Sequence, residues 1–169
     1  MAASINQGTV INNIEFAQKA LEIHDIIPVL QFSRLADMLV NTAGQLDCKL
    51  WGGKDSNNTA YIQLRVQGSL NLTCQRCLQP FEHEVTIDTR FILVRNESEM
   101  PAPEDESDDE DYLSIQVEMP VLELIEDELL LALPIAPKHE EGECVNENNS
   151  NEYKKPNPFA KLELLKSKK

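Results

Sequence analysis

The sequence predicts an α+β fold: an antiparallel sheet built around a long β-hairpin, packed with two helices, with an acidic linker and a flexible C-terminal tail. Two observations favour this architecture. Between Ile62 and Leu93, apolar residues alternate with polar ones in two runs that flank Pro80, which is the pattern of half-buried strands. In two other segments, apolar residues recur every three or four positions, as in amphipathic helices. Because each element has a single apolar face, the helices and the sheet must cover one another.

The first third of the chain predicts several short elements. Residues 9–24 show no clean period and are interpreted as a strand followed by a turn. Residues 31–43 predict one amphipathic helix that ends near Gly44. Its apolar stripe comprises Phe32, Leu35, Ala36, Leu39 and Val40. Residues 46–51 predict a short strand, and residues 52–58, with two glycines and two asparagines, predict a turn.

The hairpin is the clearest prediction. From Ile62 to Cys74 the even-numbered positions are apolar, apart from Gly68, and the odd-numbered ones are polar. After Pro80 most apolar residues fall on odd positions, so the two runs predict antiparallel strands joined by a tip at residues 74–80. Gly68 interrupts the apolar face and predicts a bulge or a close approach by another segment.

An acidic segment and a second helix follow the hairpin. Residues 96–111 contain nine acidic residues and two prolines, a composition that forms no core and predicts a disordered linker. Residues 113–117 alternate weakly and predict a further strand. The second helix is predicted from Pro120, a favourable first helical residue, to Leu133. Its polar face comprises Glu123, Glu126 and Asp127.

Charge is distributed unevenly along the chain. We expect one α+β domain over residues 1–138, which includes the linker, followed by a C-terminal loop and basic tail over residues 139–169. The net charge is −14, but residues 154–169 hold six lysines and one glutamate and carry +5, which leaves −19 for residues 1–153. An acidic body repels nucleic-acid phosphates and suits basic protein partners such as ribosomal proteins. A simpler interpretation is that the acidic surface only keeps the protein soluble.

Hydropathy indicates the compartment. No stretch is apolar for long enough to span a membrane, and the N-terminus lacks the basic start and apolar run of a secretory signal. We therefore expect a cytoplasmic protein without a membrane partner. In that compartment the four cysteines are free thiols or metal ligands rather than disulfides.

Cys74-x-x-Cys77, at the predicted hairpin tip, is the sharpest local motif. Two thiolates at this spacing on a turn suit tetrahedral zinc, which needs two further ligands. His139 and Cys144 are the candidates for these positions. The four residues together predict one structural zinc that joins the hairpin tip to the C-terminal loop.

Other interpretations of the cysteines remain open at this point. His83 and Cys48 are competing ligands, and Cys74 and Cys77 could equally be a buried small residue and an idle turn residue. A zinc-stapled structural adaptor without RNA contact is one alternative function, and a thiol-redox function of the Cys74/Cys77 pair is another. The redox function is weakened by the strand-and-turn context, because redox pairs usually lie at a helix N-terminus, which lowers the thiol pKa.

The C-terminal tail predicts a contact site. Asn157 can cap, and Pro158 can open, a short helix with an apolar side, which would dock in a groove while the lysines meet RNA phosphates or an acidic partner. Alternatively, Phe159 packs on its own domain and the lysines aid solubility. The candidate contact residues are Lys154, Lys155, Asn157, Pro158, Phe159, Lys161, Leu162 and Leu165.

Motifs of the common enzyme classes are missing from the sequence. There is no Gly-rich phosphate loop and no G-x-S-x-G nucleophile elbow. Acidic residues are abundant, but they lie in the predicted linker or on an exposed helix face, where they solvate rather than catalyse. We therefore expect a non-enzymatic protein without a small-molecule substrate.

Three motifs occur in a characteristic order: Cys-Gln-Arg-Cys-Leu at residues 74–78, Leu-Ala-Leu-Pro at residues 131–134 and Lys-Pro-Asn-Pro-Phe-Ala at residues 155–160. In this order and spacing, the chain resembles the YceD family over nearly its whole length. The resemblance implies a bacterial cytoplasmic factor in ribosome biogenesis that supports synthesis, processing or stability of 23S ribosomal RNA. It also implies a ribosomal protein or an RNA-processing factor as partner. Some relatives carry extra cysteines in the C-terminal loop, which favours metal binding there.

Overall fold

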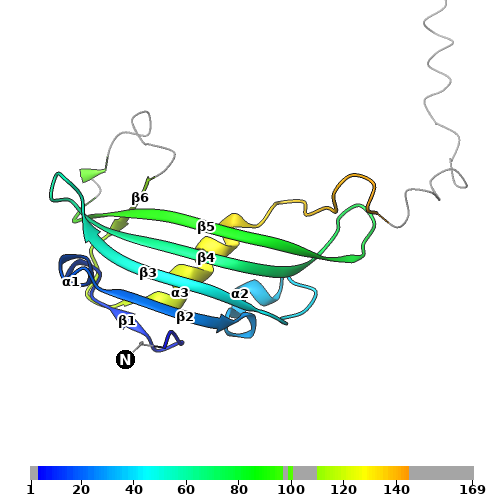
Figure 1. Ribbon diagram of the computed structural model, residues 1–169, viewed down its shortest axis with the longest axis horizontal. Helices are drawn as coiled ribbons and strands as arrows, with labels where there is room; N and C mark the ends of the chain where they lie inside the picture. Colours follow the sequence, from blue (N-terminus) through cyan, green and yellow to red (C-terminus); the bar gives the residue numbers. More distant parts are fainter. Residues whose placement is uncertain (1–3, 97–98, 101–109, 145–169) are drawn as a thin grey trace, which may run out of the picture.

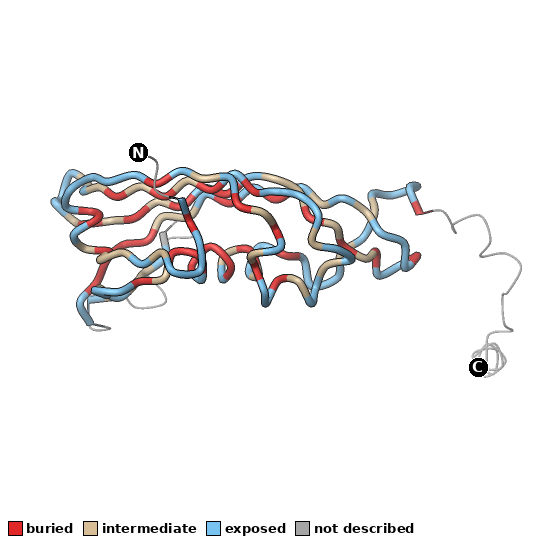
Figure 2. Tube along the Cα trace, turned by 90° about the horizontal axis from the view of Figure 1, so that it is seen from below, coloured by how far each residue is buried: buried red, intermediate tan, exposed pale blue. Residues whose placement is uncertain are grey.

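The computed structural model describes residues 4–96, 99–100 and 110–144 of the 169-residue chain. The predicted basic tail and most of the predicted acidic linker lie outside these residues. A mixed five-stranded sheet forms one layer, and helices form a second layer on one of its faces (Figures 1 and 2). The α+β fold class is therefore confirmed.

The main sheet has the strand order β2-β3-β4-β5-β6. Its strands are β2 (Glu22–Pro28), β3 (Gln45–Lys54), β4 (Ala60–Thr73), β5 (Pro80–Val94) and β6 (Glu110–Ser114). A separate two-stranded pair joins β1 (Val10–Ile11) to β7 (Met119–Pro120). The helices are α1 (Asn13–Gln18), the 3₁₀ helix η1 (Val29–Gln31), α2 (Ser33–Ala36) and α3 (Val121–Ala132). Among the described residues, none of the helices has the length and apolarity needed to cross a membrane.

The predicted hairpin is confirmed as β4 and β5. The two strands pair antiparallel from Tyr61 opposite Ile92 to Thr73 opposite Pro80, without an inserted residue. The apolar phase of each strand faces the helices and is buried, as the alternating colours in Figure 2 show. This alternation aligns two half-buried strands in a single register, because a shift by one residue would expose the whole apolar face.

Gly68 marks a close approach rather than a bulge. It pairs in register with Val85 on one side and Leu46 on the other. A Cβ atom at this position would lie 2.6 Å from Cδ2 of Leu46 and 3.0 Å from the backbone oxygen of Gln45, so a larger residue would displace the neighbouring strand or its side chain.

The helix predicted at residues 31–43 is wrong in length. Phe32, at φ −90° and ψ 90°, separates η1 from α2, which has only four residues. The N–H of Val40 then donates to the carbonyl of Asn71 at 2.8 Å, which attaches the chain to β4. Phe32 and Leu35 are both fully buried. Their apolar spacing therefore reflects side chains that two short helical turns bury, and not one continuous helix.

Around these helices, two further predictions need correction. Residues 9–24 contain β1, α1 and the start of β2 rather than one strand and a turn. The strand predicted at residues 46–51 is confirmed but runs over residues 45–54, so the turn predicted from residue 52 begins only at Asp55. There, Oδ1 of Asp55 accepts hydrogen bonds from the N–H groups of Asn57 and Thr59, each at 2.8 Å.

The last strand of the sheet runs parallel to its neighbour. β6 begins at Glu110, inside the segment predicted as linker, and pairs parallel with β5 from Arg90 opposite Glu110 to Val94 opposite Ser114. The strand predicted at residues 113–117 is therefore shifted, and the sheet is not purely antiparallel. A parallel neighbour requires a crossover connection of a dozen or more residues, and the acidic segment between β5 and β6 supplies that length.

Helix α3 is confirmed, with Pro120 as its N-cap instead of its first residue. One residue on its predicted polar face is buried. Glu126 accepts hydrogen bonds at Oε1 from the N–H groups of Arg34 and Leu35, at 2.7 and 3.1 Å, and its Oε2 lies 2.8 Å from Nε of Arg34. Because α2 begins at these residues, this carboxylate caps α2 and fastens it to α3.

Candidate metal centre

The hairpin tip forms a knuckle around Cys74. The N–H of Cys74 donates to the carbonyl of Gln79, and the carbonyl of Cys74 accepts from the N–H of Leu78, both at 2.9 Å. Leu78 adopts a positive φ of 60°, which turns the chain back into β5. The N–H of Arg76 points at the sulfur of Cys74 at 3.4 Å. This tight turn places Cys74 and Cys77 on the same side of the tip.

The loop after α3 runs back to this knuckle. The N–H of Gln75 donates to the carbonyl of Pro137 at 2.8 Å, which fixes the loop beside the tip just before His139. The loop then turns so that Cys144 lies against the hairpin. The two candidate ligands of the loop therefore meet the two of the tip, although more than 60 residues separate them along the sequence.

Four possible ligand atoms gather at this place. The Sγ atoms of Cys74 and Cys144 are 3.7 Å apart, and Nδ1 of His139 lies 3.4 Å from Sγ of Cys77 and 3.7 Å from Sγ of Cys144. One ligand atom from each of the four residues lies within 4.8 Å of the others, so the group could hold a metal ion. All three cysteines are buried, and they form a small cluster apart from the main core, with Phe81 packed against it.

The environment favours a thiolate at Cys74. Burial alone raises the pKa of this thiol, but hydrogen bonds from the backbone N–H groups of Cys77, His139 and Arg76 and from the His139 side chain outweigh burial and lower the pKa to about 5. At Cys144, burial raises the pKa and the neighbouring thiols add to the rise, while the guanidinium of Arg76 opposes it. Because metal ligation requires thiolates, the lowered pKa of Cys74 suits this residue to bind a metal ion.

Two supporting side chains were missed by the sequence reasoning. Nε of Arg76 donates to Sγ of Cys144 at 3.0 Å, and its NH2 group lies 3.4 and 3.3 Å from the carbonyls of His139 and Glu140. The ring of Phe81 lies 5.0 Å from the ring of His139, tilted by 41°. Arg76 belongs to the tip motif and Phe81 follows it at the start of β5, but nothing in their spacing indicates that they contact a loop so distant in sequence.

The competing ligands lie elsewhere. His83 contacts Phe81 edge-on, at 6.3 Å between ring centres, and is not part of the four-residue group. Cys48 is buried in the main core, where burial, together with the nearby Asp47 and Asp25, raises the pKa of its thiol to about 12. Of the sequence-based alternatives within the described residues, the structure thus assembles the set Cys74, Cys77, His139 and Cys144.

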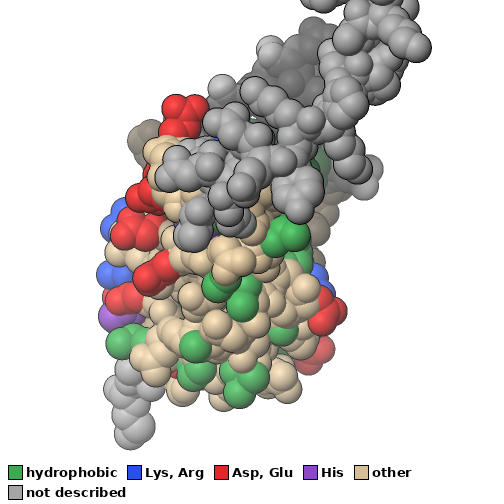
Figure 3. Space-filling view, turned by 90° about the vertical axis from the view of Figure 1, so that its right-hand side faces the viewer, with side chains coloured by type: hydrophobic (Ala, Val, Ile, Leu, Met, Phe, Trp, Pro, Cys, Tyr) green, Lys and Arg blue, Asp and Glu red, His purple; other side chains and the backbone are tan. Residues whose placement is uncertain are grey.

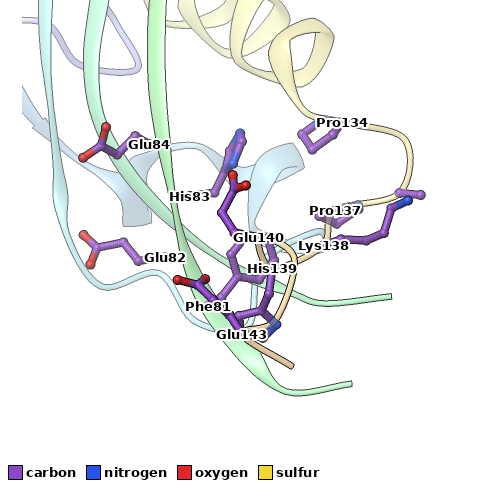
Figure 4. A pocket seen from close by; sticks show the side chains of 11 residues that line it. Phe81, Glu82, His83, Glu84, Pro134, Pro137, Lys138, His139, Glu140 and Glu143 are labelled. Atoms are coloured by element: carbon purple, nitrogen blue, oxygen red, sulfur yellow. The ribbon is translucent and has the colours of Figure 1, made fainter. Parts of the chain in front are cut away.

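A hollow adjoins the centre on the side of β5. It has a volume of about 670 Å³ and is shared between the start of β5 and the loop after α3. Figure 4 shows Phe81 and His83 on one wall and Glu140 and His139 on the facing loop, with Pro134 and Pro137 further along that loop. His139 therefore belongs both to the ligand group and to the lining of the hollow.

The second set of candidate residues, at positions 154–165 of the tail, lies outside the described residues. Its contact with a partner or with RNA therefore stays a prediction.

Comparison with known proteins agrees with the order of the motifs. Residues 62–166 match the family model described as "Large ribosomal RNA subunit accumulation protein YceD". A Haemophilus influenzae protein of the same description is 30% identical over 172 residues, an alignment that covers 94% of this chain and 95% of the relative. No solved structure matches this chain.

Proposed function

Because the chain belongs to the YceD family of large ribosomal RNA subunit accumulation proteins, we propose that it is a non-enzymatic factor in bacterial ribosome biogenesis. It acts in the cytoplasm and supports the synthesis, processing or stability of 23S ribosomal RNA. The observation that carries the proposal is the family membership, which extends over nearly the whole chain and rests on a relative of matching length. The family's description names the accumulation of an RNA and no chemical reaction.

Protein partners are the proposed means of action. Residues 1–153 carry a formal charge of −19, which opposes binding of an RNA backbone and favours binding of a basic protein. A ribosomal protein or an RNA-processing factor has the required chemistry. Residues 154–169, with a charge of +5, are the segment proposed to contact RNA or an acidic surface of a partner.

A single structural zinc, held by Cys74, Cys77, His139 and Cys144, is the second part of the proposal. In a tetrahedral site with Zn–S bonds of about 2.3 Å, two sulfur ligands lie about 3.8 Å apart, and a sulfur and a nitrogen ligand about 3.5 Å apart. Three of the six separations, 3.7 Å between two sulfurs and 3.4 and 3.7 Å between sulfur and nitrogen, fit these values, and all four ligand atoms lie within 4.8 Å of one another. When bound, the metal would cross-link the loop to the hairpin tip. Four protein ligands would fill its tetrahedral coordination, which is the arrangement of structural rather than catalytic zinc sites.

A thiol-redox function has one supporting observation, the lowered pKa of Cys74. Exchange with an external disulfide also requires access to the attacking sulfur. Cys74 is 0% exposed, Cys77 is 7% exposed and Cys144 is 5% exposed. Burial of all three sulfurs beside an imidazole therefore supports metal binding over thiol exchange.

The proposal is tested in a bacterium that lacks its own copy of the gene. We expect the wild-type chain to restore the ratio of 23S to 16S ribosomal RNA, and a Cys74→Ser/Cys77→Ser variant to restore it only in part, because the loop is no longer fastened. Wild-type protein that leaves the RNA ratio unrestored contradicts the proposed function. Full restoration by the double variant contradicts only the role of the metal.

A further inference from the structure

The hollow beside the metal centre has the chemistry of a receptor for a basic side chain. Four glutamates and one lysine line it, which gives the lining a formal charge of −3 with the histidines neutral. Within the described part of the chain, none of these glutamates forms an ion pair with a basic side chain. Glu140 and Glu143, on the loop, therefore lack an ion-pair partner among the described residues, and Lys138 is the single lysine of the lining.

The four glutamates are placed differently. Glu140 and Glu143 stand on the loop, and Figure 4 shows the carboxylate of Glu140 directed toward His83 across the hollow. Glu82 and Glu84 project from the opposite side of β5, where they reinforce the negative potential at the rim. A cation inside the hollow would therefore meet the loop glutamates first.

The walls add an aromatic surface to the carboxylates. The ring of Phe81 is near the rings of both His83 and His139, at centre-to-centre distances of 6.3 and 5.0 Å. A guanidinium can stack on such a surface and at the same time donate paired hydrogen bonds to a carboxylate. A volume of about 670 Å³ accommodates such a side chain with part of its own backbone.

The surroundings also favour a basic peptide. Figure 3 views the end of the molecule that carries the hairpin tip, and acidic side chains, with some lysines and arginines among them, lie along both flanks of the visible face with hydrophobic ones between them. The body of the chain is acidic as a whole, with −19 over residues 1–153. A basic segment is therefore attracted before it makes contact, and this attraction raises the association rate.

We propose that the hollow formed by Phe81, His83, Pro134, Pro137, Glu140 and Glu143 binds an arginine or lysine side chain on a basic segment of a partner protein. This inference deepens the proposed function, since it assigns the partner's docking site. It also assigns the metal centre a structural role in forming the binding site. The loop that carries Glu140 and Glu143 is fastened between His139 and Cys144, so the same four ligands that close the loop also shape the receptor.

Binding of a fluorescent decapeptide of alternating arginine and glycine to the full-length protein tests the inference. We expect saturable binding that weakens as salt is added, and no binding of the matching glutamate–glycine peptide. Glu140→Gln/Glu143→Gln should lower the affinity roughly tenfold, because two carboxylates are lost. Glu118→Gln/Glu123→Gln, which neutralises two exposed acids outside the hollow, is the charge-matched control and should leave the affinity unchanged. A chelator should weaken binding in the wild-type protein.

Two outcomes overturn the inference. If the double variant and the control bind the peptide equally well, the peptide responds to overall acidity and the hollow is not its site. If zero-length cross-linking of the free protein joins tail lysines to Glu140 or Glu143, the occupant is the protein's own tail and not a partner. Either result leaves the proposed function standing if the wild-type chain still restores 23S ribosomal RNA, so the two failures are distinguishable.

Discussion

At the scale of single residues, two glutamates of α3 differ in how their charge is compensated. Glu126 has hydrogen-bond donors around its carboxylate, whereas burial of Glu128 disfavours its charged form. Glu126 is 5% exposed, and its carboxylate accepts the N–H groups that open α2 and the Nε of Arg34. Burial raises the pKa of Glu126, but these hydrogen bonds outweigh burial and hold the pKa below its usual value. Its charge is therefore compensated in the folded protein.

Glu128, two residues further along α3 and on another side of the helix, lacks such compensation. Burial raises its pKa, Asp111 and Asp127 add to the rise, and a 2.7 Å hydrogen bond from Oγ1 of Thr89 offsets it only in part. The folded state then binds the proton more tightly than the unfolded state, so stability falls as pH rises through the interval between the ordinary value of 4.5 and the raised one.

We therefore expect Glu128→Gln to raise the free energy of unfolding at pH 7, since the glutamine oxygen still accepts from Thr89 without a charge. Urea unfolding at pH 7 and at pH 4 measures this difference. The gain should shrink at the lower pH, where the wild-type carboxyl group is already protonated in the folded protein. If Glu128→Gln instead lowered the free energy of unfolding at pH 7, the charged form of Glu128 would stabilise the folded protein and the prediction would be wrong.

The sequence identified single residues where a local motif carried the signal. Cys74 and Cys77 form such a motif, and His139 and Cys144 followed because a tetrahedral site requires four ligands. Arg76 and Glu126 were not identified by role, because their contacts join segments more than 60 residues apart and leave no periodic trace. The hollow was missed for the same reason.

At the scale of elements, close packing between α1 and the sheet depends on a glycine. A Cβ atom on Gly52, in β3, would lie 2.6 Å from Cα of Ala17 and 2.8 Å from the carbonyl oxygen of Phe16. Both atoms are backbone, so α1 would have to move away from the strand. The N–H of Gly52 also donates to the carbonyl of Leu21 at 2.9 Å, which attaches the connection between α1 and β2 to β3.

Gly52→Ala should accordingly lower the free energy of unfolding by about 1–3 kcal/mol. Gly8→Ala is the control, because a Cβ there would meet only the side-chain oxygen of Asn6 at 3.4 Å. The change in the control should stay within about 0.5 kcal/mol. Chemical denaturation of the two variants decides the matter, and equal stabilities would argue against close packing of α1 on β3.

Elements with a long, regular period were predictable, and short ones were not. The alternation in β4 and β5 extends over many residues, and α3 repeats its apolar stripe through three turns. α1 and α2 have six and four residues, which is too short for a helical period to register. The parallel pairing of β6 was unpredictable because strand direction depends on where the connection crosses, which no local pattern records.

At the scale of the whole molecule, charge separates the chain into an acidic body and a basic end. Residues 154–169 hold six lysines, and we expect their charge to be used in a contact with a partner or with RNA. Replacing all six by glutamine should reduce accumulation of 23S ribosomal RNA in a strain without the gene, and the melting temperature should stay unchanged. The six lysines are Lys154, Lys155, Lys161, Lys166, Lys168 and Lys169.

A variant with arginine at the same six positions is the matched control for this prediction. It preserves the charge, so it should restore the RNA as the wild type does if attraction to phosphates or carboxylates is what matters. Full restoration by the glutamine variant would indicate that the lysines serve only solubility.

The central claim is that a metal ion fastens the C-terminal loop to the hairpin tip. Native mass spectrometry of the freshly purified full-length protein, with and without a chelator, tests it most directly. We predict one zinc ion per chain, lost in Cys144→Ser but retained in Cys48→Ala, whose thiol is buried in the main core away from the centre. A folded wild-type protein that carries no metal, or a Cys144→Ser variant that keeps its zinc, would contradict the account.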